Sequence, residues 1–111
     1  MKEKKLFAVV IMMDGTPLLC EMTVADKWTK IKRIVGSNRL EMVTPRKGDY
    51  AKVIIFEKYA YVGPLNYIAS ELARQEVRSQ AVVLADHGGN ACLMSEKAAL
   101  ITAEKIRKGS I

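Results

Sequence analysis

The side chains best suited to contacting a ligand follow an apolar stretch, in the run Asp86-His87-Gly88-Gly89-Asn90. Two glycines let the backbone approach a ligand closely, and successive free N–H groups in such a turn form a nest for an anion. The side chains of Asp86, His87 and Asn90 would then contact hydroxyls or a base edge. A plain hairpin turn also needs Gly and Asn, and the phosphate-loop pattern with a following Lys-Ser or Lys-Thr is missing. Both interpretations, an anion site and a plain turn, are open.

His87 is the only histidine, and the sequence gives it little support as a catalytic residue. A catalytic base needs a nucleophile and a third group to orient it. Asp86 is adjacent, but neighbouring side chains on an extended chain point apart. One histidine with the distant Cys20 and Cys92 does not make a metal-ligand set. The sequence therefore predicts a non-enzymatic protein with no catalytic residues, no metal and no cofactor, and a small hydrolase using His87 is the weakest alternative.

A second candidate contact region, residues 59–66, precedes a predicted helix. Pro64 is typical of a helix start, where free N–H groups favour an anion. Asn66 would hydrogen-bond a base or ribose, and Tyr61 or Tyr59 would stack on a base. The alternative is that the tyrosines cover the end of the sheet and that Asn66 satisfies its own loop.

The net charge of +6 is concentrated in one fifth of the chain. Residues 26–47 contain seven cations and two carboxylates. Of these cations, Arg33, Arg39, Arg46 and Lys47 are the candidate phosphate contacts. The charge favours an anionic partner and excludes a protein that imitates DNA through an acidic surface. A solvated basic face is the simpler explanation of such a cluster.

The composition indicates a folded protein. Of the 111 residues, 50% are hydrophobic and 27% are charged, which suits one compact domain spanning residues 1–111. No apolar run approaches the roughly 20 residues that cross a bilayer, and no secretory leader is recognisable. We therefore expect a cytoplasmic protein, within the host cell if it is phage-encoded, with reduced cysteines and no membrane partner.

Hydrophobic periodicity predicts strands and helices in the order ββαββαβ(β)α. The expected strands span residues 6–13, 18–24, 39–44, 50–57, 81–85 and 91–94, and the expected helices span 25–35, 64–75 and 95–108. Asp14-Gly15 suits the tight turn of the first hairpin. The fold class is α+β, with a mixed, mostly antiparallel sheet of five or six strands and three helices on one face of the sheet.

The basic helix expected over 25–35 has apolar residues at helical spacing. Trp28 and Ile31 are expected to face the core, with Trp28 as an anchor there rather than a platform for a base. Asp26 is a candidate cap for the first turn, and Gly36 is placed to end the helix.

The sheet also has edges, which makes a homodimer or higher oligomer an open prediction. Pairing through an edge strand or the last helix would use residues such as Met94, Leu100 and Ile106. A monomer with covered edges is the alternative.

Short motifs give the chain a family resemblance. Val35-Gly36 precedes Leu40-Glu41-Met42-Val43, and Gly63-Pro64-Leu65-Asn66 precedes the strand expected at 81–85. In these motifs the chain resembles a family of small phage and mobile-element domains of unknown function. That family typically has Ile-Glu-Val and Leu-Pro-x-Asn at these places, so Leu40-Glu41 and Pro64-Leu65-Asn66 depart from its pattern. The resemblance implies a phage context, in which some small proteins sequester the nucleotide messengers of host defence intact.

The leading hypothesis is therefore a non-enzymatic phage-type protein that binds a nucleotide-like anion and sequesters a defence signal. Arg33, Arg39, Arg46 or Lys47 would contact the phosphates, while Asn66 and residues 86–90 would contact the sugar or base. One alternative is a nucleic-acid-binding protein that uses residues 26–35 and the Arg46-Lys47 turn. Another is an adaptor or inhibitor that binds an acidic host protein.

Overall fold

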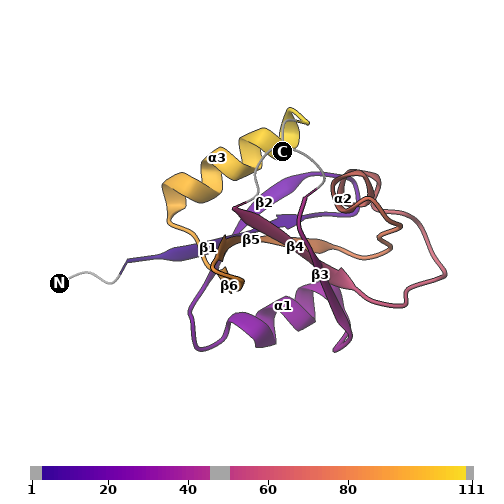
Figure 1. Ribbon diagram of the computed structural model, residues 1–111, viewed down its shortest axis with the longest axis horizontal. Coiled ribbons are helices and arrows are strands. Elements are labelled where there is room, and N and C mark those ends of the chain that lie inside the picture. Colours follow the sequence, from indigo (N-terminus) through magenta and orange to yellow (C-terminus); the bar gives the residue numbers. More distant parts are fainter. Residues whose placement is uncertain (1–3, 46–50, 110–111) are drawn as a thin grey trace.

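The computed structural model describes residues 4–45 and 51–109, which form six strands and three helices (Figure 1). The elements are β1 (Leu6–Ile11), β2 (Pro17–Met22), α1 (Lys27–Val35), β3 (Leu40–Val43), β4 (Lys52–Glu57), α2 (Tyr67–Ala73), β5 (Ala81–His87), β6 (Asn90–Cys92) and α3 (Glu96–Arg107). The α+β class and the predicted order of elements are confirmed.

The strands form one sheet in the order β2-β1-β5-β4-β3, and β6 pairs with the end of β5. Every described pairing is antiparallel, so the sheet is antiparallel rather than mixed. β5 is central because it pairs with both β1 and β4. The outer strands β2 and β3 are the two edges of this order.

The β1–β2 hairpin turns at Gly15, as the Asp14-Gly15 dipeptide predicts. Gly15 has φ +90°, and its N–H donates to the Met12 carbonyl oxygen at 2.8 Å. A Cβ at this position would lie 2.7 Å from Cγ1 of Ile68 in α2. The glycine therefore serves both the turn and the close approach of α2.

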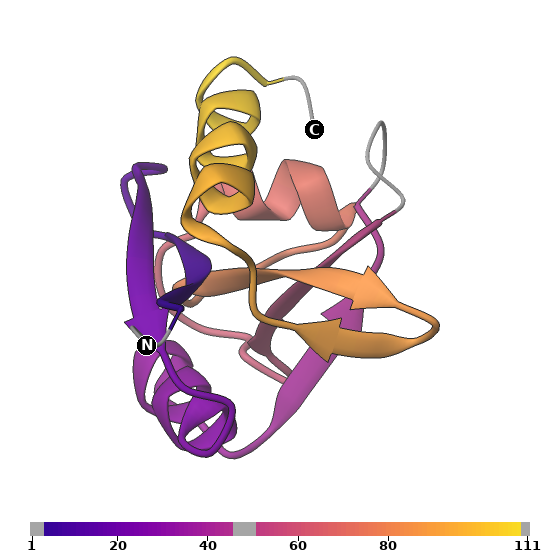
Figure 2. The ribbon, with the colours of Figure 1, turned by 90° about the vertical axis from the view of Figure 1, so that its left-hand side faces the viewer.

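Helices cover both faces of the sheet, so the prediction of three helices on one face is wrong. α2 and α3 lie on one side and α1 on the other (Figure 2). The cause is the apolar run of β5, whose Val83 packs with the α2 and α3 side while Val82 and Leu84 pack with the α1 side. A strand that is apolar on both faces needs cover on both.

Trp28 is not the core anchor that we expected. Ile31 and Val35 are the buried residues of α1, whereas Trp28 is 41% exposed. The Lys27 side chain extends to the sheet instead, and its Nζ donates to the Ala91 carbonyl oxygen at 2.5 Å. The predicted end of the helix is confirmed, because Gly36 adopts φ +83° and its N–H donates to the Lys32 carbonyl oxygen.

Candidate functional site

The run from Asp86 to Asn90 forms the tight turn between β5 and β6, where His87 pairs with Asn90. Gly88 and Gly89 have φ values of +60° and +87°, which a two-residue hairpin turn requires. The Gly89 N–H donates to Oδ1 of Asp86 at 3.0 Å. The Asp86 carboxylate thus occupies the nest that we expected to hold an anion. The plain-turn interpretation fits this geometry, with His87 and Asn90 exposed at its ends.

Asn66 is a structural residue and not a ligand contact. It is fully buried, and its Nδ2 donates to the carbonyl oxygens of Ile11 and Ser79, both at 3.1 Å. Its Oδ1 accepts from the Ala69 N–H at 3.2 Å and so caps α2. Helix α2 starts at Tyr67 rather than at Pro64, because Asn66 provides this cap.

The two predicted cationic contacts that the structure describes, Arg33 and Arg39, do not line the same pocket. Arg33 is exposed on α1, and Arg39 is exposed just before β3. Arg46 and Lys47 lie outside the described residues. Arg33 lines an open hollow of about 430 Å³ at the C-terminal end of α1. The free carbonyls of a helix end carry negative character, so part of the Arg33 charge complements the helix rather than an anionic ligand.

Helix α1 carries a cluster of basic residues around Trp28, which we call the α1 surface: Lys27, Trp28, Lys30, Lys32 and Arg33. These include four cations, and the helix itself contains no carboxylate. Asp26, just before the helix, pairs with Lys30 at 3.5 Å. Lys32 and Arg33 are exposed and make no ion pair with any residue in 4–45 or 51–109. The charge of Lys32 and Arg33 that does not complement the end of the helix therefore remains for a partner.

Trp28 lies among these cations with part of its ring open to solvent. The Lys27 Nζ is 5.1 Å from the Trp28 ring centroid while it donates to the Ala91 carbonyl oxygen. This contact holds the N-terminal end of α1 against β6 and supports the indole from one side. The exposed aromatic ring and the unpaired cations thus belong to the same short helix.

Asp26 orders the turn before α1 and does not cap the helix with its side chain. Its Oδ1 accepts from the Thr23 N–H at 2.8 Å, and the Thr23 hydroxyl accepts from the Asp26 N–H at 3.1 Å. The Thr23 N–H, helped by the charge of Lys30, holds the pKa of the Asp26 carboxyl below its usual 3.8. The carboxylate is thus ionised at neutral pH and shares part of the Lys30 charge.

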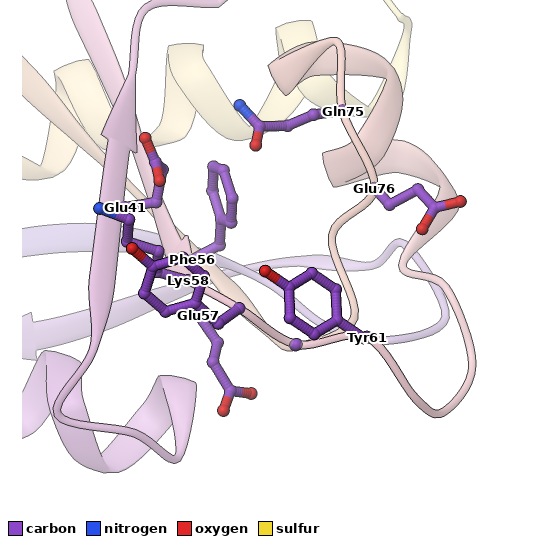
Figure 3. Close-up of a pocket in the computed structure, with 9 residues that line it drawn as sticks. Glu41, Phe56, Glu57, Lys58, Tyr61, Gln75 and Glu76 are labelled. Carbon is purple, nitrogen blue, oxygen red and sulfur yellow. The ribbon is translucent and has the colours of Figure 1, made fainter.

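Tyr61 lies at a different place, in a hollow of about 290 Å³ beside β3 and β4 that we call the edge pocket (Figure 3). Its lining includes Glu41, Phe56, Glu57, Lys58, Tyr59 and Tyr61. Gln75 and Glu76, which follow α2, also line it. Three carboxylates and one ammonium make this pocket acidic. The expectation that Tyr61 stacks on the base of an anionic ligand therefore conflicts with its surroundings.

Arg78 fixes the loop that carries Tyr61. Its Nη1 donates to the Gly63 carbonyl oxygen, and its Nη2 lies 3.1 Å from Oε2 of Glu76. The Arg78 side chain is only 18% exposed, whereas that of Glu76 is 68% exposed, so the ion pair lies at the surface. The loop of residues 59–66 is thereby attached to the chain after α2, and the two walls of the edge pocket are held together.

The sequence interpretation missed most of this pocket. Glu41 and Glu57 fall within the expected strands 39–44 and 50–57, and Gln75 at the end of the expected helix 64–75, and none of the three was a candidate contact residue. The local pattern Glu57-Lys58-Tyr59-Ala60-Tyr61 concentrates aromatic and charged groups and was the available indication. The contribution of β3 and of the segment after α2 depends on tertiary packing, which no local pattern gives.

The chain matches no protein-family model, no curated protein and no solved structure in the comparisons. The resemblance to the phage and mobile-element domains thus stays a prediction. Within residues 4–45 and 51–109, no helix is long and apolar enough to cross a membrane. In the same part of the chain, no three His, Cys, Asp or Glu side chains gather in a way that suits a metal ion.

Proposed function

We propose that this chain binds single-stranded nucleic acid through the α1 surface, without catalysing a reaction. The observation that carries the proposal is the exposed Trp28 ring beside the unpaired cations Lys32 and Arg33. Bases stack on aromatic side chains, which contributes about 1–3 kcal/mol per base, and phosphates pair with Lys and Arg. Trp28 and Lys32 are four positions apart on α1 and so lie on the same side of the helix, with Arg33 one position further along.

The wide opening of the hollow beside Lys32 and Arg33, and the spread of the cations along α1, favour an extended polyanion over a small nucleotide. Tight sequestration of a small molecule uses a concave site that encloses most of the ligand. Arg33, His87 and Tyr61 instead lie on α1, at the β5–β6 turn and in the edge pocket, respectively. A nine-residue helix is about 13 Å long, which suits contact with several nucleotides in a row. Sequestration of a defence nucleotide stays a prediction with less support.

Trp28 is the only tryptophan, so its emission reports contact at the proposed site. We expect an oligothymidine strand to quench this emission in low salt and a duplex of matched length to quench it less. The affinity of a fluorescein-labelled strand, followed by anisotropy, should fall linearly with salt on logarithmic axes. Trp28→Ala should weaken this binding about tenfold, the equivalent of about 1.4 kcal/mol for one stacked base.

Lys32→Ala tests the phosphate contact, with Lys97→Ala on α3 as the charge-matched control. The first variant should reduce the slope of the salt dependence by about 0.7, and the second should leave it unchanged. Equal effects of the two variants would mean that only net charge matters, which would refute the α1 site.

Polyglutamate in the same buffer separates a nucleic acid from an acidic protein. Quenching by polyglutamate as strong as that by oligothymidine would favour the adaptor hypothesis over ours. Absence of any binding to oligothymidine in low salt would remove the nucleic-acid proposal.

A further inference from the structure

The edge pocket has the opposite charge to the chain as a whole. Its lining carries Glu41, Glu57 and Glu76 against one Lys58, in a chain with a net charge of +6. It also lies on the other side of the sheet from α1, because Phe56 packs in the same core cluster as α2 and α3. A ligand of this pocket is therefore distinct from the partner of the α1 surface.

The three carboxylates have different roles. Glu76 pairs with Arg78, and in Figure 3 the Glu57 carboxylate points away from the hollow. The Glu41 carboxylate, the Phe56 ring and the Tyr61 hydroxyl border a common space there, with the Gln75 amide at its far side. Glu41 makes no ion pair within residues 4–45 and 51–109. The pocket thus presents one uncompensated carboxylate.

The aromatic wall of the pocket already holds an ammonium of the chain. The Lys58 Nζ lies 5.0 Å from the Tyr59 ring centroid, within the range of a cation–π contact. The Tyr61 ring is tilted by 41° to that of Tyr59 at a centroid distance of 6.3 Å, and Tyr61 is 75% exposed. No described cation lies over Tyr61. The Tyr61 ring can therefore make with a ligand cation the same cation–π contact that Tyr59 makes with Lys58.

We propose that the edge pocket binds a small organic cation, a guanidinium or primary ammonium on a short carbon chain. The charged group would pair with Glu41 and lie against Tyr61, while its carbon chain would contact the Phe56 ring. The volume of about 290 Å³ is at the small end for ligand cavities, which fits a single such group. The cation comes either from a free amine or from an Arg or Lys side chain of a peptide.

Agmatine is the probe for this proposal, titrated into the ¹⁵N-labelled chain while backbone amide shifts are followed. We expect saturable shifts at residues 41, 58–61 and 75–76, and none on α1. Butylurea, which is similar in shape to part of agmatine but uncharged, should not produce them. Shifts with butylurea equal to those with agmatine, or no shifts at millimolar agmatine, would overturn the proposal.

Two variants with opposite expected effects sharpen the test. Glu41→Gln should weaken agmatine binding by a factor of ten or more, about the effect of losing a hydrogen bond to a charged group. Lys58→Met removes the competing ammonium from Tyr59 and should strengthen binding severalfold. Glu96→Gln on α3 changes the net charge as Glu41→Gln does and should leave the affinity unchanged. Equal weakening by Glu41→Gln and Glu96→Gln would refute a specific site.

The two sources of the cation are separated by comparing agmatine with a short Arg-containing peptide whose ends are blocked. If the peptide binds at least tenfold more tightly than agmatine, the natural ligand is a protein segment. If agmatine binds at least tenfold more tightly than the peptide, the natural ligand is a free amine. Circular dichroism of each variant checks that the fold is kept. Tyr61→Ala provides a further variant with little risk to folding, because the ring is mostly exposed, and it should also weaken binding.

Discussion

Replacement of Asn66 by alanine should destabilise the whole fold, although the sequence predicts this residue as a ligand contact. The substitution removes one helix cap and two donors to buried carbonyl oxygens, those of Ile11 and Ser79. Loss of a cap costs about 0.5–2 kcal/mol, and a buried group without its partner costs about 1–3 kcal/mol. Because one substitution removes both kinds of interaction, we expect a total loss of about 2–4 kcal/mol.

Urea denaturation followed by far-ultraviolet circular dichroism measures this loss. The midpoint should fall while the slope stays constant, because the unfolded surface does not change. Asn38→Ala is the matched control, since Asn38 is exposed and surface substitutions usually change stability by less than about 0.5 kcal/mol.

Asn66→Ser separates the two roles of the side chain. Serine keeps an acceptor for the cap of α2 but does not reach the carbonyl oxygens of Ile11 and Ser79. The serine variant should therefore lie between the wild type and the alanine variant in stability. An alanine variant within about 0.5 kcal/mol of the wild type would refute the structural role of Asn66.

Two further predictions concern the turns. Gly15→Ala should lower the free energy of unfolding by about 2 kcal/mol or more, because the new Cβ would meet Ile68 and the backbone has a positive φ. In Gly36→Ala the new Cβ meets nothing within 4 Å, so the loss should be only about 1 kcal/mol. Equal losses of the two variants in thermal unfolding would contradict this. The pKa of the Asp26 carboxyl, measured by NMR, should lie below 3.8. In Thr23→Val the backbone N–H of residue 23 still lowers this pKa, but the lowering should be smaller than in the wild type because the hydroxyl is lost. Because the folded pKa is the lower one, the stability from Asp26 is present above pH 3.8 and is lost as the pH falls through the folded pKa.

The order of elements was predictable because each carries a local pattern. The apolar run of β5 and the Asp14-Gly15 turn are properties of a few adjacent residues, and both predictions are confirmed. Because successive residues of β5 are apolar, the same run also indicates that both faces of the sheet are covered. Since the placement of each helix depends on how the hairpins connect, the pattern alone did not assign α1 to its own face.

Side-chain roles were harder to predict than elements. Trp28 and Lys27 are neighbours on α1, and which of them faces the sheet depends on the open carbonyl of Ala91, 64 positions away in the sequence. The buried position of Asn66 likewise depends on carbonyl groups in β1 and before β5. For the edge pocket, Tyr61 was predicted as a contact residue, but the acidic side chains around it come from elements distant in sequence.

The central place of β5 also determines when the protein can fold. Val9 of β1 pairs with Val83 of β5, and Ile54 of β4 pairs with the same residue from the other side. At about 5–20 residues per second, synthesis of the roughly seventy residues between β1 and β5 takes about 4–15 s. Until β5 emerges, the β1–β2 hairpin has no central strand to pair with, and its buried residues stay open to other chains. During that interval the nascent chain exposes apolar residues that can associate with other chains.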